Sequence, residues 1–168
     1  MDISTSKIKE LRELASAGIM DCRNALLETN GDLEKAHELL KEKGTAKALK
    51  RAERVASQGL VECYIHTGGR VGSMIELNCE TDFVARTDDF KQLAHEVAMQ
   101  IAAMNPLCIS TEEMPEDIDT EPEVACLLLQ SYIKSPDQTI QDLISEVIAK
   151  TGENIKIGRF ARFELGAG

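Results

Sequence analysis

One group of side chains in this sequence could perform nucleophilic chemistry. Cys79 lies close to Glu76 in the chain, and His66 or His95 could act as a base for its thiol. A catalytic thiol needs a base within hydrogen-bond reach and a lowered pKa. The sequence indicates neither condition, and both histidines are predicted to face solvent or to fill capping roles. We therefore do not expect Cys79 to be catalytic.

The chain also lacks the short motifs that carry phosphate or metal chemistry. It contains no GxxxxGK[ST] phosphate loop, no HExxH zinc motif and no acidic calcium loop with its required glycine. The five cysteines form an odd set without a CxxC pair, so they are interpreted as reduced, half-buried thiols. We expect no catalytic residue, no metal site and no cofactor, and hence a protein that is not an enzyme.

The stretch ELNCETDFVARTDDF, residues 76–90, indicates recognition instead. It begins as a strand and leaves the strand pattern at Thr81 and Asp82, so Phe83 and Val84 fall in the joint before the next helix. Such joints are normally polar, because loop backbone must reach water. The two apolar residues could close the end of the core, or Phe83 could project beside a carboxylate as a hot spot for a partner. The residues alone leave both interpretations open.

Length and composition are those of an ordinary globular protein. The 168 residues are 43% hydrophobic and 29% charged, enough for one domain or for a small module and a larger core. No apolar run approaches the roughly 18 residues that would cross a bilayer. The N-terminus MDISTSKIKELREL lacks the continuous hydrophobic stretch of a secretory signal. We therefore expect a cytoplasmic protein that does not enter a membrane.

The net charge of −10 is concentrated in the second part of the chain. Residues 60–168 carry nineteen acidic side chains against eight Lys and Arg, whereas residues 1–59 are near neutral. An acidic surface repels a phosphate backbone, so direct nucleic-acid binding is not expected. The basic stretch at residues 41–54 is the candidate exception. Because no aromatic residue precedes Tyr64 to stack on bases, a solvated linker helix is the favoured interpretation there.

Apolar residues recur at helical spacing three times in residues 1–44, which predicts a small three-helix module. The predicted caps and ends are Thr5 or Ser6, the Asn30-Gly31 pair and Gly44. The predicted buried residues are Ile8, Leu11, Leu14 or Ala15, Ile19, Cys22, Ala25, Leu26, Leu33, Ala36, Leu39 and Leu40. Residues 45–59 favour a further helix that links this module to the rest of the chain.

From Leu60 the apolar spacing changes from helical to alternating. A hairpin is predicted over residues 60–78. Its predicted buried face consists of Val61, Cys63, Ile65, Val71, Ile75 and Leu77. A strand is also predicted for IKIGRFARFEL, residues 155–165, which is long enough to pair with the hairpin.

The clearest helix is predicted over residues 88–104, with Asp88 or Asp89 as its cap. Its apolar stripe consists of Phe90, Leu93, Ala94, Val97, Ala98 and Ile101. The other predicted segments are an exposed acidic loop with a single turn over 105–123, a weaker helix over 124–133 and a helix from Thr139 that ends at Gly152. Helices on one face of a small antiparallel three-stranded sheet give an α+β core, residues 60–168.

Three ordered motifs resemble those of the translation elongation factor Ts family. ELNCETDFVAR, residues 76–86, is similar to the family signature without a gap. LRELASAGIMDCRNAL, residues 11–26, with the following GDLEKAHELLKEKG, is similar to the N-terminal motif, and residues 152–165 resemble the final strand. Ala15 replaces a usual hydroxyl residue and Arg23 a usual lysine, and neither should disturb a helix. The sequence is therefore identified as a member of this family.

The resemblance implies a UBA-like N-terminal module and a guanine-nucleotide exchange factor that binds elongation factor Tu, with GDP or without nucleotide. The partner-binding residues carried over by motif are Arg12, Ile19 and Met20 in the module and Thr81, Asp82, Phe83 and Val84 in the core. The module would dock, and the Asp-Phe pair would enter near the magnesium and switch region. Ile19 and Met20 are adjacent, so at least one should be exposed. The alternative for Met20 is a flexible core filler.

Length separates this chain from the long members of the family. Those members carry two related core subdomains, whereas only one fits between Leu60 and Gly168. Compact members pair with themselves, so the resemblance implies a homodimer. The alternative function is that residues 1–44 form a helical interaction module for a different partner. That hypothesis leaves the Thr81-Asp82-Phe83 stretch unexplained.

Overall fold

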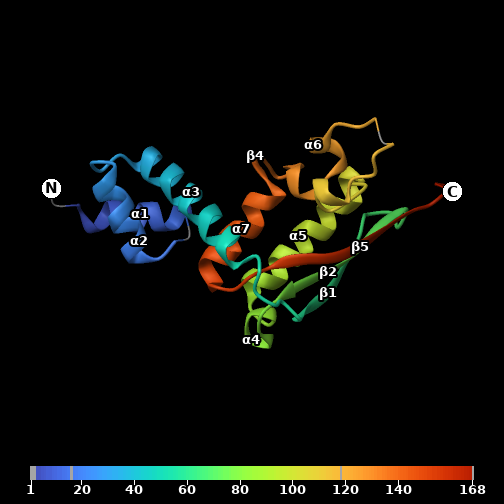
Figure 1. Cartoon of the computed structure of the whole chain (residues 1–168), viewed down its shortest axis with the longest axis horizontal. Coiled ribbons are helices and arrows are strands. Elements are labelled where there is room, and N and C mark those ends of the chain that lie inside the picture. The colour runs from blue at the N-terminus through green and yellow to red at the C-terminus, as the bar shows by residue number, and fades with distance from the viewer. Residues whose placement is uncertain (1–2, 16, 118, 168) are drawn as a thin grey trace.

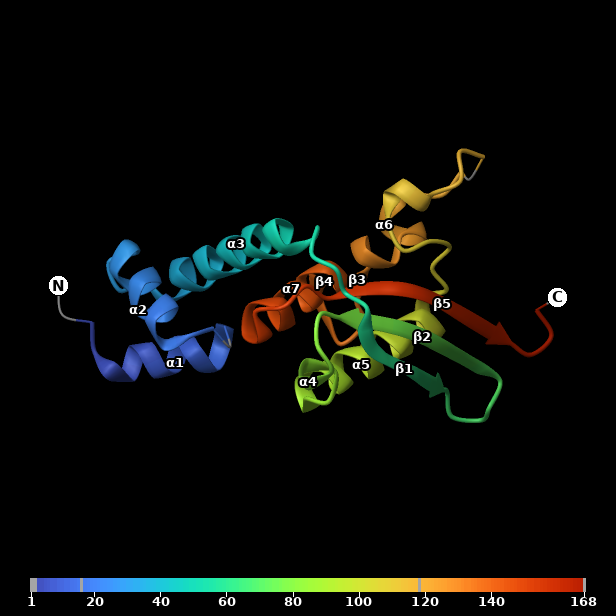
Figure 2. The same ribbon diagram turned by 60° about the horizontal axis from the view of Figure 1, so that its bottom comes forward.

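The computed structural model describes residues 3–15, 17–117 and 119–167. An N-terminal group of helices lies beside a core in which helices cover one face of a small antiparallel sheet (Figures 1 and 2). This arrangement confirms the predicted α+β class. Within the described ranges, none of the helices combines the length and the apolar character that crossing a bilayer requires.

Three helices form the N-terminal module. They are α1 (Thr5–Ala15), α2 (Ile19–Glu28) and the first half of α3 (Leu33–Arg51). Their shared core consists of Ile8, Leu11, Cys22, Ala25, Leu26, Ala36 and Leu40. The predicted periodicity therefore found the interior of the module, with the exception of Ile19, which is exposed; of Leu14 or Ala15, it is Ala15 that packs against this core.

The ends of these helices depend on local hydrogen bonds. Ser4 caps α1 in place of the predicted Thr5 or Ser6, because its hydroxyl accepts from the Lys7 backbone N–H at 3.3 Å. After α2 the backbone turns through Asn30-Gly31, as predicted, with φ of 54° and 81°.

Helix α3 runs without a break through Gly44, which corrects the predicted end there and the separate linker helix. The helix is anchored on both sides of this glycine, because Leu40 is buried in the module core and Ala48 in the core of the sheet. A glycine costs a helix about 1 kcal/mol, whereas burying one leucine contributes about 1.5–3 kcal/mol. The division into units 1–44, 45–59 and 60–168 stays a prediction.

Strands β1 (Gln58–Ile65), β2 (Val71–Cys79) and β5 (Lys156–Glu164) form an antiparallel sheet in the order β1-β2-β5. The hairpin and the pairing of the final strand with it are therefore confirmed. In β2, Ile75 and Leu77 are buried as predicted.

The predicted face of β1 is wrong. The three residues predicted to be buried, which are Val61, Cys63 and Ile65, are exposed. Leu60 and Tyr64 pack against the core instead. The register gives the reason: Leu60 lies opposite Leu77 and Glu62 opposite Ile75, so these residues share the covered face. Because β1 carries apolar residues on both faces, alternation alone could not select the buried one.

Helices α5 (Asp88–Met104) and α7 (Ile140–Thr151) build the layer over the sheet. Helix α5 packs along β1 and β2, and α7 packs against α5 and α3 (Figures 1 and 2). The predicted apolar stripe of α5 is buried throughout, but its cap is Thr87, whose hydroxyl accepts from the Phe90 N–H at 3.3 Å. Helix α7 begins with a capping box and ends at Gly152, as predicted.

The segment between α5 and α7 corrects the helix predicted over 124–133. It contains η1 (Thr111–Glu113), α6 (Pro122–Ala125), η2 (Leu127–Leu129), β3 (Ser131–Tyr132) and β4 (Ser135–Thr139). The single turn η1 agrees with the predicted loop, but the loop is not exposed throughout, because Cys108 is buried against Cys126. In the rest of the segment, buried side chains make hydrogen bonds that take the place of helical backbone bonds. The Gln100 amide of α5 donates to the Gln130 side chain and to the Ser131 carbonyl at 3.2 and 3.1 Å.

The continuity of α3 can be tested at its only internal glycine. We expect Gly44→Ala to stabilise the protein by about 1 kcal/mol, because a Cβ at this position meets no atom within 4 Å. Urea unfolding followed by circular dichroism measures the change. Gly152→Ala is the matched control, because Gly152 has φ of 77° and equal space, and alanine there should cost about 1–2 kcal/mol. Destabilisation by Gly44→Ala would contradict a continuous helix.

Candidate partner-binding site

The Thr81-Asp82-Phe83 stretch forms a short capped helix at the tip of the core. Helix α4 (Asp82–Ala85) follows β2 directly and lies at the end of the sheet away from the loop of the hairpin (Figure 1). Thr81 is its N-cap, and the Thr81 hydroxyl accepts from the Val84 N–H at 3.4 Å. The predicted irregular joint is therefore a helical turn with a defined start.

The two large apolar residues of this turn, Phe83 and Val84, point in different directions. Val84 is only 9% exposed and belongs to the main core, whereas Phe83 is 78% exposed. Successive residues of a helix lie about 100° apart around its axis, so one can anchor the turn while the other projects. Of the two interpretations, closing the core applies to Val84 and outward projection applies to Phe83. Asp82 lies beside the ring and pairs with Arg86 at 2.7 Å.

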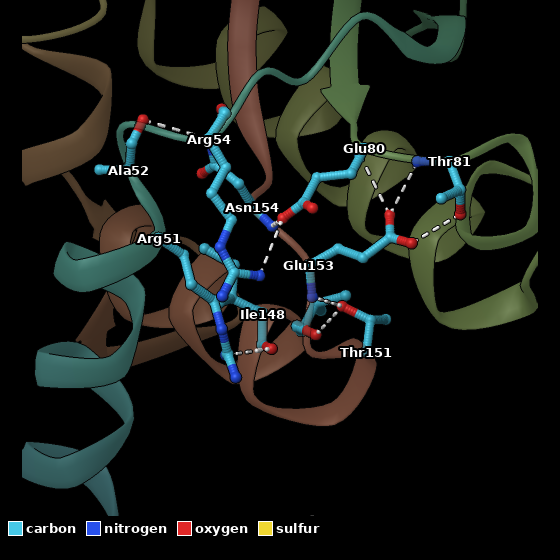
Figure 3. A network of polar contacts seen from close by, with 10 residues as sticks. Arg51, Ala52, Arg54, Glu80, Thr81, Ile148, Thr151, Glu153 and Asn154 are labelled. Carbon is cyan, nitrogen blue, oxygen red and sulfur yellow. Dashed lines mark hydrogen bonds and ion pairs between the residues drawn. The ribbon is translucent and has the colours of Figure 1, made fainter.

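A carboxylate from a distant loop holds the backbone before α4. Glu153 follows α7 and accepts from the backbone N–H groups of Glu80 and Thr81 and from the Thr81 hydroxyl (Figure 3). The next residue, Asn154, contacts the chain at the end of α3. Sequence analysis did not identify this pair, because a bond between a side chain and a backbone more than 70 residues away leaves no periodic pattern.

The predicted docking residues of the module lie on its surface. Arg12 is exposed, and Ile19 and Met20 are 54% and 60% exposed. Met20 is therefore not a core filler. Ile19 shares the helical stripe of Cys22 but stands at the first residue of α2, where the module core ends. Leu14 is an exposed apolar neighbour, and of the predicted alternatives Leu14 and Ala15 it is Ala15 that packs against the module core.

An open groove lies between these residues and the helices α5 and α7 of the core. Arg12, Ile19 and Met20 line one side, and Asp89 and Lys150 line the other, joined by an ion pair at 3.1 Å. Asp89 lies in the first turn of α5, which packs against α4. The groove thus runs from the predicted docking residues to the start of α5, the helix that packs against α4.

A second surface lies on the uncovered face of the sheet. In the described part of the chain no helix lies over this face (Figures 1 and 2). Its exposed apolar residues are Val61, Cys63, Ile65, Met74, Ala161 and Phe163. Monomeric proteins rarely leave a large contiguous apolar patch in water. Sequence analysis missed this patch because it assigned the first three of these residues to the interior.

One end of this open face is polar. The Asn78 amide and the Arg159 guanidinium both bond to Glu76, and together they lower the pKa of its carboxyl group. The ion pair between Glu76 and Arg159 is 2.8 Å long and joins β2 to β5. A partner that covered the apolar part would therefore meet a charged border on this side.

The thiol chemistry considered from the sequence has no geometry to support it. Cys79 pairs with Gln58 at one end of the hairpin, whereas His66 follows the pair Ile65–Gly72 at the other end. Burial raises the pKa of the Cys79 thiol, the opposite of activation. His95 faces Glu62 at 3.3 Å. Among the described residues, no three His, Cys, Asp or Glu side chains gather as metal ligands.

Comparison with known proteins identifies relatives along nearly the whole chain. A family model described as elongation factor TS matches residues 3–125. Elongation factor Ts of Caldanaerobacter subterraneus subsp. tengcongensis is 48% identical, with 99% of this chain and 98% of the relative covered. Elongation factor Ts of Syntrophomonas wolfei subsp. wolfei is 50% identical, with 99% and 92% covered, and that of Thermotoga sp. strain RQ2 is 46% identical, with 100% and 98% covered. The aligned stretches are 196 residues long, so these relatives contain residues that this 168-residue chain lacks.

The different orientations of Phe83 and Val84 predict different effects on stability. Phe83→Ala should change the free energy of unfolding by less than about 0.5 kcal/mol, as expected for an exposed residue. Val84→Ala should lower it by about 1.5 kcal/mol, because two buried methyl groups are lost. Urea unfolding of the two variants measures both values. A large loss of stability for Phe83→Ala would show that the ring belongs to the core.

Proposed function

Because the chain belongs to the elongation factor Ts family of translation elongation factors, we propose that it is a guanine-nucleotide exchange factor for elongation factor Tu. The observation that carries the proposal is Phe83, an aromatic ring that is 78% exposed on a capped turn at the tip of the core. A large ring beside a carboxylate on a rigid scaffold has the properties of a binding hot spot.

In the proposed mechanism the module binds first. Arg12, Ile19 and Met20 dock on the nucleotide-binding domain of elongation factor Tu, on the side of the groove that leads towards α4. Asp82 and Phe83 then enter near the magnesium and switch region. Thr81 and Val84 contribute to the same site by capping and anchoring the turn.

Exchange by this route requires no chemical step in this chain. A guanine nucleotide is held by Mg²⁺ and by phosphate contacts to backbone N–H groups at a helix N-terminus. A small shift of the supporting elements weakens both contacts and releases GDP. Because coupling between two ligands is reciprocal, the nucleotide that rebinds weakens the exchange factor and displaces it. Any GTP chemistry therefore belongs to the partner.

We also propose that the protein is a homodimer formed through the open face of the sheet. Two sheets can pack face to face at about 10 Å with interdigitating side chains, and the exposed apolar residues of β1, β2 and β5 are of the kind such packing buries. A second copy would supply the second core that long family members carry in one chain.

The exchange function is tested by following the release of a fluorescent GDP from elongation factor Tu. Saturating protein should accelerate release, and Phe83→Ala should reduce this acceleration by about one to two decades, because burying a phenylalanine contributes about 1.5–3 kcal/mol. No acceleration by the unchanged protein would contradict the function and favour a helical module for another partner.

Docking by the module predicts a different kinetic effect. Met20→Asp should raise the protein concentration that gives half-maximal acceleration by about tenfold or more, because a charge replaces an apolar contact. Leu49→Asp is the matched control, since Leu49 is also an exposed apolar residue on a helix but lies outside the groove. Equal effects of the two variants would argue against a docking role for Met20.

The dimer is tested at the centre of the open sheet. Met74 lies on the middle strand between Cys63 and Ala161, so Met74→Asp should shift sedimentation equilibrium from dimer to monomer. Val55→Asp, at an exposed apolar residue outside the sheet, should leave the dimer intact. Cys63 is the one exposed cysteine of the five. Its reaction with a maleimide should therefore be slow in the dimer and fast in the Met74→Asp monomer.

A further inference from the structure

We propose that Glu153 and Asn154 are positioning residues that hold the Asp82-Phe83 turn and the end of α3 in one fixed arrangement. The inference rests on the proposed exchange function, because it concerns how the two partner-binding surfaces are held relative to each other. Asn154 is 3% exposed and Glu153 is half-buried. Neither is assigned a contact with the partner.

Glu153 fixes the backbone that leads into α4. Its Oε2 accepts from the N–H groups of Glu80 and Thr81 at 3.1 and 3.0 Å, and its Oε1 accepts from the Thr81 hydroxyl at 2.6 Å (Figure 3). A carboxylate is an acceptor at both oxygens, so one side chain satisfies three donors of two consecutive residues. These donors lie directly before the turn that carries Phe83.

The same carboxylate sets the direction of the Thr81 hydroxyl. A hydroxyl has one proton to donate and can accept through its lone pairs. Because the proton of Thr81 goes to Glu153, its oxygen is free to accept from the Val84 N–H as the cap of α4. The start of the helix is therefore coupled to the carboxylate, although the two are 72 residues apart.

Asn154 binds the backbone that follows α3, as Glu153 binds the backbone that leads into α4. Its side-chain amide donates to the carbonyl groups of Ala52 and Arg54, at 3.2 and 2.8 Å, just after α3. Its backbone N–H donates to the Glu80 side chain at 2.6 Å. Glu80 in turn donates its own N–H to Glu153. Residues 80–81 and residues 153–154 are therefore linked by hydrogen bonds in both directions. In addition, Arg51 at the end of α3 donates to the Ile148 carbonyl of α7 at 3.2 Å.

The consequence follows from the continuity of α3. This helix carries part of the module core at one end and meets Asn154 just beyond its other end. Fixing the chain after α3 therefore limits where the docking residues lie relative to Phe83. The exposed ring of Phe83 has no buried contacts to place it, so its position depends on the backbone of α4. Holding both surfaces before binding lowers the ordering entropy lost on insertion.

The test compares variants in the release of fluorescent GDP from elongation factor Tu. Glu153→Gln keeps the size of the side chain but replaces one acceptor oxygen by a donor, so the turn is no longer held by a charged group. We expect the plateau rate, which is the rate of GDP release at saturating protein, to fall about tenfold. A change of this size corresponds to the loss of about one charge-assisted hydrogen bond. The concentration for half-maximal acceleration should change little, because the docking residues are untouched. Asn154→Ala should also lower the plateau.

Glu62→Gln is the matched control. Glu62 is a half-buried glutamate bonded to His95 and lies outside this network, so its variant should keep the plateau of the unchanged protein. Folded Glu153→Gln and Asn154→Ala proteins with unchanged plateau rates would overturn the inference while leaving the exchange function intact. Failure of the unchanged protein to accelerate release would overturn the proposed function, and the inference with it.

A measurement on the unchanged protein covers the case in which these variants do not fold. The N–H groups of Glu80 and Thr81 donate to a side chain rather than to a strand. If Glu153 holds them, their hydrogen exchange should be slowed at least as much as that of the neighbouring end of β2. Exchange at the rate of an unstructured chain would overturn the inference without any substitution.

Discussion

The carboxylate of Glu153 connects the end of α7 to the backbone before α4, and the position of the Phe83 ring depends on this connection. An exposed ring gains little from its own protein, so contacts elsewhere must determine where it points. Val84 provides one such contact by burying its side chain in the core. The charge-assisted hydrogen bonds to Glu153 provide the others, and such bonds are shorter and stronger than neutral ones. A polar network thus places an apolar group without covering it.

The same separation between residues that stabilise and residues that are displayed occurs in each unit. In α2, Cys22, Ala25 and Leu26 belong to the module core, while Ile19 and Met20 at its start remain in water. In the sheet, Ile75 and Leu77 pack under α5, while Met74 on the same strand faces outward. Exposed apolar groups add little to the stability of the monomer. Their presence on three surfaces is therefore best explained by partners, whether a second protein or a second copy.

Sequence reasoning predicted an element correctly where a single local pattern determined its structure. The stripe of α5, the end of α7 at Gly152 and the final strand each follow from spacing and from one residue's backbone preference. It failed where a distant contact decided the outcome. Gly44 resembles a helix end, but the burial of Leu40 and Ala48 in two cores carries the helix through it. Both faces of β1 are apolar, so only its register with β2 selects the buried one. The projection of Phe83 was predicted as one of two alternatives, whereas the bonds from Glu153 and Asn154 could not be predicted, since they join segments far apart in the chain.

The proposed exchange function also requires that the protein leave its partner, and this requirement limits how the turn can be built. If apolar burial held Phe83 in place, the ring would have to break contacts with its own protein before each insertion, and this step would reduce the free energy available for binding. Hydrogen bonds to the backbone before α4 fix the turn while leaving the ring free. The expected contribution of the ring, about 1.5–3 kcal/mol, changes an equilibrium by one to two decades. In the proposed exchange function, a contribution of this size would favour GDP release and would still let the next nucleotide displace the protein by the reciprocal coupling.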